Sequence, residues 1–294
     1  MSYAPPPINV TGKKIEDLKP WQRWLYLVFP APCLSCGEPA PPTKTSVGLC
    51  EDCTARLLEW PHDACGRCGR LLEAAHLPEG YLCGTCRQSP PVYDRLLCRF
   101  SYESPLEEVI VGLKFRRLDY LGPRLGNGMA RHFHLELSDI DAVTAVPMHW
   151  LRYLQRGYNP AWILAAPLAR ALGKPLVRML VRRTLNSPQR TLKRDARRNN
   201  LRRAFQARRP RDIQGRHILL VDDVMTTGAT LDAAATCLRQ SGARAITALT
   251  LARTPNEAER RLLTLSLDGR RSELPGERGK NTTPNGKNDT QRSS

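Results

Sequence analysis

The sequence predicts an α/β protein, with a parallel sheet flanked by helices and a small cysteine-rich domain before it. Between residues 90 and 253, near-continuous runs of Val, Ile and Leu alternate with helical patterns, as expected for parallel strands buried on both faces. Before that region, eight of the ten cysteines fall into CxxC pairs. The chain of 294 residues is 41% hydrophobic, so it can bury the core of one or two domains.

Four regions are expected along the chain. Residues 1–20 carry prolines and mixed charges without periodicity, which predicts a flexible lead-in. Residues 21–90 are expected to form a docking helix, with apolar side chains from Trp21 to Phe29 at helical spacing, followed by the cysteine-rich domain. Residues 91–254 form the α/β domain. Residues 255–294 are charged and offer little to bury, which predicts a disordered tail.

The cysteine pairs repeat as CxxC-x13-CxxC and CxxC-x14-CxxC, and this internal repeat indicates two similar sites. Two CxxC turns supply four thiolates, which complete a tetrahedral zinc site and leave no open position for catalysis. Two structural zinc ions are therefore expected, while iron–sulfur clusters and redox dithiols remain alternatives. The eight predicted ligands are Cys33, Cys36, Cys50, Cys53, Cys65, Cys68, Cys83 and Cys86.

The α/β region contains four expected strands and four expected helices. The strands are short apolar runs, whereas the helices show apolar residues at helical spacing. The strands cover residues 95–102, 141–148, 216–224 and 244–252, and the helices cover residues 105–117, 120–137, 159–173 and 229–243.

Two adjacent carboxylates end the strand at 216–224. Asp222 and Asp223 stand at its carboxyl end, where parallel sheets bind ligands, and the hydroxyl-rich turn TTGAT follows at 226–230. Backbone N–H groups at the start of the next helix favour an anion. The pattern predicts a phosphate held by the turn and sugar hydroxyls held by the carboxylates, whose repulsion a divalent cation relieves.

The stretch HILLVDDVMTTGAT (217–230) resembles the phosphoribosyl pyrophosphate signature of type I phosphoribosyltransferases. The stretches AVPMHWLRYLQRGYNPAWILA (145–165) and RRTLNSPQRTLKRDARRNNLRRAF (182–205), together with the cysteine-rich half, resemble the ComF family, which is linked to bacterial DNA uptake during competence. The resemblance implies a type I phosphoribosyltransferase-like sheet preceded by a double zinc-ribbon domain. It also implies Mg²⁺ as the cofactor that accompanies phosphoribosyl pyrophosphate.

Transferred to this sequence, the resemblance assigns roles to three sets of residues. Asp222 and Asp223 are the catalytic candidates and hold the ribose hydroxyls. The 5′-phosphate is assigned to Thr226, Thr227, Gly228, Ala229 and Thr230. The pyrophosphate-loop candidates are Pro147, Met148, His149 and Arg156, and the candidates in a mobile arm that closes over the site are Gln189, Arg197 and Asn200.

A formal charge of +17 and a pI near 9.8 favour polyanionic partners. Two functions fit this charge: a phosphoribosyltransferase, or a non-catalytic protein that senses phosphoribosyl pyrophosphate or a nucleotide and handles single-stranded DNA with the competence machinery. A zinc-ribbon transcription regulator fits less well, because nothing resembles a helix-turn-helix. No window reaches the roughly 18 apolar residues of a membrane span and no signal peptide is evident, so a cytoplasmic location is expected.

Overall fold

The computed structural model describes residues 31–40, 47–61, 63–72, 78, 80–183 and 204–271. The predicted lead-in at 1–20 and the docking helix between Trp21 and Phe29 lie outside these residues, and so does the final part of the predicted tail, residues 272–294.

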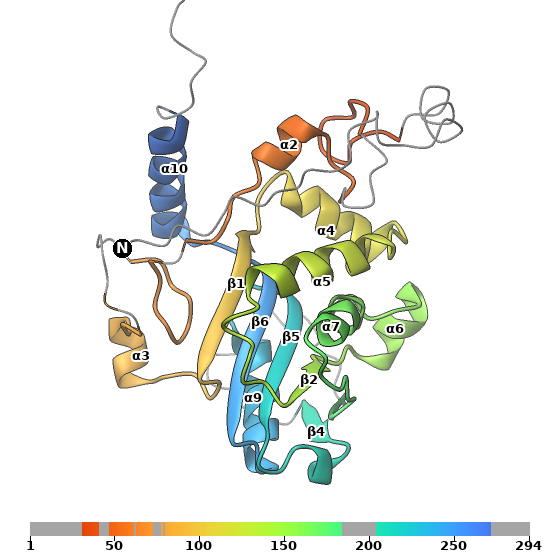
Figure 1. Ribbon diagram of the computed structural model, residues 1–294, viewed down its shortest axis with the longest axis vertical. Helices are drawn as coiled ribbons and strands as arrows, with labels where there is room; N and C mark the ends of the chain where they lie inside the picture. Colours follow the sequence, from red (N-terminus) through yellow and green to blue (C-terminus); the bar gives the residue numbers. More distant parts are fainter. Residues whose placement is uncertain are drawn as a thin grey trace, which may run out of the picture.

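A four-stranded sheet forms the centre of the α/β domain, and all its strand pairs are parallel (Figure 1). Its order is β1 (Arg95–Ser101), β6 (Ala245–Arg253), β5 (His217–Met225) and β2 (Ala142–Ala145). The predicted class and the four strands are confirmed. The register pairs Ala145 with Val221, so the loop after β2 begins beside Asp222 at the carboxyl end of β5.

Helices cover both faces of this sheet, as the buried strands require. Alternate residues of β5 point to opposite faces, so Leu219 and Val221 join one apolar cluster while Ile218 and Leu220 join the other. The first cluster contains α4 (Leu106–Phe115), α5 (Leu121–His132) and α7 (Pro160–Ala171). The second contains α9 (Ala229–Gln240), which lies behind the sheet in Figure 1, and the antiparallel strands β3 (Leu180–Arg182) and β4 (Phe205–Ala207).

The cysteine-rich domain is built from two similar ribbons. In each ribbon an antiparallel bridge closes the first CxxC turn, Pro32 with Pro39 and Ala64 with Leu71. The second CxxC pair of each ribbon starts a short helix, α2 (Glu51–Ala55) or α3 (Gly84–Gln88). The internal repeat seen in the sequence is therefore a repeat of local structure.

The helix α10 (Glu257–Arg271) corrects the prediction of disorder from residue 255. The side chain of Glu259 is buried and pairs with that of Arg253 at 2.5 Å, and Leu263 packs in a cluster with Trp60 and Leu71 of the second ribbon. Among the side chains of residues 257–264, whose burial the structure describes, only those of Glu259 and Leu263 are buried, so the composition of this segment resembles that of an unfolded tail. Its order comes from contacts with residues about 190 positions earlier in the chain, such as the bond from Leu71 N–H to Glu259 Oε1, which spans 188 residues.

The sequence reading also missed α6 (Trp150–Arg156), the short η2 (Pro210–Asp212) and the strands β3 and β4. None of the seven residues of α6 is buried, so the helix has no apolar periodicity that leads to the core. No helix within the described ranges is both long and apolar enough to cross a membrane.

Candidate functional site

The turn between β5 and α9 has the geometry of an anion site. Gly228 adopts φ 77° and is the N-cap of α9, a left-handed conformation that a glycine adopts without strain. The Thr227 hydroxyl accepts a hydrogen bond of 3.4 Å from Ala229 N–H, and Thr226 and Thr227 are exposed. The turn thus presents hydroxyl groups next to the N-terminus of a helix of 12 residues, where backbone N–H groups favour negative charge.

The two carboxylates before this turn lie in different environments. Asp223 Oδ1 is 3.1 Å from Lys114 Nζ, which forms an ion pair with it from α4. Asp222 retains some solvent-accessible surface, but its carboxyl is enclosed, and this burial, followed by repulsion from Asp223, raises the pKa of Asp222 to about 8. At neutral pH this shift favours the protonated form of Asp222.

The predicted pyrophosphate loop follows β2 and is tied to β5 by a bond of 2.8 Å from Val146 N–H to Val221 O. Within it, Pro147 and Met148 line a cavity of about 370 Å³. His149 is buried and caps α6, because its Nδ1 accepts a hydrogen bond of 3.2 Å from Leu151 N–H. His149 thus has a structural task that the sequence did not indicate, and the role of the loop in binding pyrophosphate stays a prediction.

A cationic cavity of about 420 Å³ lies beside the carboxylates. Arg156 lines it and lies 4.9 Å over the ring of Phe115; burial lowers its pKa, and the charge of Asp223 opposes this effect. The other lining residues are Lys114, Phe115, Arg117, Arg152, Gln155 and Tyr158. The sequence reading identified Arg156 but missed Lys114 and Arg117, although a lysine directly after the buried Leu113 was a usable signal.

The candidate arm residues Gln189, Arg197 and Asn200 fall in residues 184–203, outside the described part of the chain. The residues on either side of this segment belong to one pair of strands, since it begins after β3 and ends before β4. β3 and β4 are antiparallel, and Arg183 N–H donates to Ala204 O at 2.9 Å.

Two cysteine tetrads confirm the predicted grouping of the eight ligands. The four sulfur atoms of each tetrad lie within 4.8 Å of one another; the sets are Cys33, Cys36, Cys50 and Cys53, and Cys65, Cys68, Cys83 and Cys86. The same hydrogen bond recurs in both, since Cys50 N–H donates to Cys33 Sγ and Cys83 N–H donates to Cys65 Sγ, each at 3.3 Å.

These tetrads fit structural zinc. Burial alone would raise the pKa of Cys33 and Cys65, but backbone N–H donors outweigh it and lower the two values to about 6 and about 7. The backbone thus stabilises one thiolate in each tetrad. Burial and the neighbouring sulfurs raise the pKa of Cys36, Cys50, Cys68 and Cys86 when no metal charge is present, and a bound Zn²⁺ would favour their thiolate forms and complete a tetrahedral site with four sulfurs.

Comparisons with known proteins match both halves of the chain. The family model described as the phosphoribosyl transferase domain matches residues 160–264, and the one described as the double zinc ribbon domain matches residues 24–87.

Three similar proteins span most of the chain. DNA utilization protein YhgH of Escherichia coli K12 is 33% identical over 236 residues, which is 78% of this chain and 99% of that protein. Competence protein F of Haemophilus influenzae is 33% identical over 70% of this chain and 90% of that protein. Competence protein ComFC of Bacillus subtilis is 28% identical over 72% of this chain and 86% of that protein.

Proposed function

This chain belongs to the ComF family of competence and DNA-utilization proteins, and from that premise we propose that its phosphoribosyltransferase domain binds phosphoribosyl pyrophosphate together with Mg²⁺. The observation that carries the proposal is the carboxylate pair of Asp222 and Asp223 directly before the glycine turn at the N-terminus of α9. This arrangement can bind the phosphate and the hydroxyls of one ribose phosphate.

The 5′-phosphate would bind to the residues from Thr226 to Thr230, where hydroxyls and the helix N-terminus meet. The ribose hydroxyls would donate hydrogen bonds to Asp222 and Asp223. The raised pKa of Asp222 favours a proton on it in the free protein, whereas donor hydroxyls of the ribose and bound Mg²⁺ would favour its ionised form. Ligand binding should therefore release a proton near neutral pH.

The pyrophosphate group would extend towards the cationic cavity beside Asp223. Arginines suit it because a guanidinium donates paired, charge-assisted hydrogen bonds to phosphate oxygens, and Lys114, Arg152 and Arg156 border this cavity. Bound Mg²⁺ would neutralise part of the charge on the pyrophosphate, and the carboxylates of Asp222 and Asp223 are ligands of the kind that it accepts.

If the protein is a transferase, a nitrogen nucleophile attacks C1 of the ribose, the bond from C1 to the pyrophosphate oxygen breaks, and the nucleophile loses a proton. The protein's contribution would be to position the ribose and to stabilise the charge of the departing pyrophosphate with the cations of the cavity.

Thermal unfolding in the presence of Mg²⁺ and phosphoribosyl pyrophosphate tests the binding proposal. A ligand at about 100 times its Kd adds about 2.7 kcal/mol, which raises the melting temperature by several degrees. The double variant Asp222→Asn/Asp223→Asn should lose this shift. The control Asp212→Asn, which changes a carboxylate in η2, should keep it. An unaltered protein with no shift would refute the ligand assignment.

A second candidate function is a non-catalytic protein that senses phosphoribosyl pyrophosphate or a nucleotide and binds single-stranded DNA in natural transformation. The charge of +17 and the names of the relatives favour it. Pyrophosphate release, measured over a panel of nucleobases and amines, separates the two candidates. Release of pyrophosphate with at least one acceptor indicates a transferase. Binding of phosphoribosyl pyrophosphate without release of pyrophosphate with any acceptor indicates the binding protein.

A further inference from the structure

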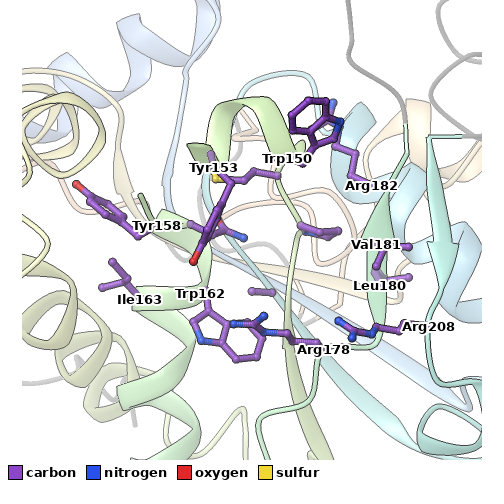
Figure 2. A pocket seen from close by; sticks show the side chains of 14 residues that line it. Trp150, Tyr153, Tyr158, Trp162, Ile163, Arg178, Leu180, Val181, Arg182 and Arg208 are labelled. Carbon is purple, nitrogen blue, oxygen red and sulfur yellow. The ribbon is translucent and has the colours of Figure 1, made fainter. Parts of the chain in front are cut away.

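The cavity that Pro147 and Met148 line lies beside β2 and α6, and we call it the second cavity. It has features that the binding of a ribose phosphate does not explain. Its volume of about 370 Å³ lies within the range of roughly 300–1,000 Å³ that is usual for small-molecule sites. Figure 2 shows that aromatic side chains of α6 and α7 and arginines of the β3–β4 segment border the same space. The lining includes three aromatic and three cationic side chains, those of Trp150, Tyr153, Trp162, Arg178, Arg182 and Arg208.

Two aromatic side chains of the cavity are exposed to solvent, and packing in the core does not account for them. Trp150 and Tyr153 lie one turn apart on α6, on the same helix face, and they are 60% and 47% exposed. No residue of α6 is buried, so these rings contribute little to the core of the described structure. Trp162 from α7 adds a third ring, and Arg178 covers it at 4.7 Å.

Three arginines line the same cavity as these rings. Arg178 and Arg208 are exposed, and no acidic residue is found among the described residues that line the cavity. Arg182 Nε is buried and finds no hydrogen-bond partner within the described part of the chain. A buried guanidinium N–H without a partner is costly, so this group favours an acceptor from a ligand.

We infer that this cavity binds an unpaired nucleotide unit, with the base stacked on Trp150 and Tyr153 and the phosphate bound to Arg178, Arg182 and Arg208. Aromatic side chains next to cationic side chains form the combination that binds single-stranded nucleic acid without sequence preference. A base inside a duplex is already stacked and paired, so a duplex cannot present it to these rings. A free nucleotide and single-stranded DNA both carry the required chemistry.

The cavity borders the proposed phosphoribosyl pyrophosphate site, because Pro147 and Met148 also line it and Arg182 acts electrostatically on Asp222. The inference is nevertheless tested separately, because Trp150, Tyr153 and Trp162 have no assigned role in binding that ligand. Asp222→Asn/Asp223→Asn should abolish the shift with that ligand and leave nucleotide binding intact. Substitutions of these aromatic residues should do the reverse.

Photocrosslinking with a thymidine oligonucleotide that contains 5-iododeoxyuridine tests the contact directly, because the irradiated base attaches to an aromatic ring stacked on it. Peptide mapping should find the attachment at Trp150, Tyr153 or Trp162. Attachment only at other sites, including residues 184–203, would overturn the inference.

Fluorescence anisotropy with the labelled oligonucleotide gives the affinity. Trp150→Ala/Tyr153→Ala should weaken binding by about tenfold, since stacking of one base has an effect of this order. Tyr120→Ala, which removes a ring that is 52% exposed elsewhere, should leave it unchanged. Arg178→Gln/Arg208→Gln should weaken binding and reduce its salt dependence, whereas Arg170→Gln on the exposed surface of α7 should not.

Competition with thymidine monophosphate and with a duplex of the same length identifies the source of the unit. Oligonucleotide binding that exceeds that of the monophosphate indicates single-stranded DNA, and equal binding indicates a free nucleotide. Wild-type affinity of the aromatic variant, or no binding of either probe to the unaltered protein, would contradict the inference.

Discussion

The two cysteine tetrads have the same spacing and the same internal hydrogen bond, yet they are held in the molecule in different ways. Three cysteines of the first tetrad, Cys33, Cys50 and Cys53, belong to the large apolar cluster formed by α4, α5 and α7. The second tetrad forms a small cluster of its own, to which Leu72 and Leu82 contribute. The first site is therefore part of the main core, whereas the second is attached to it.

The second ribbon forms hydrogen bonds with the segment before β1 and with α10, which follows β6. Arg67 donates to Pro91 O at 3.0 Å, and Glu259 of α10 accepts a bond of 3.2 Å from Leu71 N–H. Next to Pro91, Val92 N–H donates to Asp232 in the first turn of α9 at 2.7 Å. The second ribbon thus lies close in the structure to α9, the helix that follows the glycine turn, and the first ribbon does not share this connection among the described contacts.

The largest expected effect comes from breaking the tetrads one at a time. Cys53→Ser removes a ligand that is 0% exposed within the main core, and we expect the melting temperature to fall by about 10 °C or more. Cys86→Ser, in the separate cluster, should lower it by roughly half as much. Metal analysis should show the loss of one zinc in each variant. Equal losses of stability would contradict the difference in anchoring.

The next effect concerns α10. Glu259→Ala leaves the guanidinium of Arg253 buried without its partner, which costs about 3 kcal/mol. The second ribbon should loosen first, because Glu259 also accepts the hydrogen bond from Leu71 N–H. Hydrogen exchange should therefore increase at residues 63–72 more than at residues 47–55. Glu257→Ala, at an exposed position of the same helix turn, is the matched control.

A smaller effect is expected in the glycine turn before α9. A Cβ at Gly228 would lie 2.9 Å from Met225 Cε, and its φ of 77° disfavours any side chain. Gly228→Ala should cost about 1–2 kcal/mol and weaken binding of phosphoribosyl pyrophosphate. Gly128→Ala, in α5 where a Cβ meets open space, should be neutral or slightly stabilising. If both variants bind the ligand like the unaltered protein, the turn is not the phosphate site.

The last effect, similar in size to that of Gly228→Ala, reports on the carboxylates independently of both tetrads. Asp222 has a pKa of about 8 in the folded protein, above the ordinary value of 3.8, so the folded state retains a proton that the unfolded state releases. Stability should therefore fall as pH rises through this interval, by about 2 kcal/mol after allowance for solvent screening. Asp222→Asn should flatten the profile measured by urea unfolding. An unchanged slope would show that Asp222 ionises normally.

Local patterns in the sequence were sufficient to predict the cysteine tetrads, the parallel sheet and the position of the carboxylate pair. The spacing of the CxxC pairs predicted the two tetrads, because the geometry of a CxxC turn is set by adjacent residues. The alternation of apolar strands and helices predicted the parallel sheet, and the order of Asp222, Asp223 and the glycine turn placed them together because they are neighbours in the chain.

The tertiary structure decided the contacts between residues that are far apart in the sequence. The ion pair of Lys114 with Asp223 joins residues 109 positions apart, and α10 is ordered by the second ribbon. The protonation of Asp222 likewise depends on burial by distant segments, and the aromatic and cationic side chains of the second cavity come from separate elements. Burial and long-range contacts form only when the chain folds, so the charge states and the second cavity could not be predicted from the sequence.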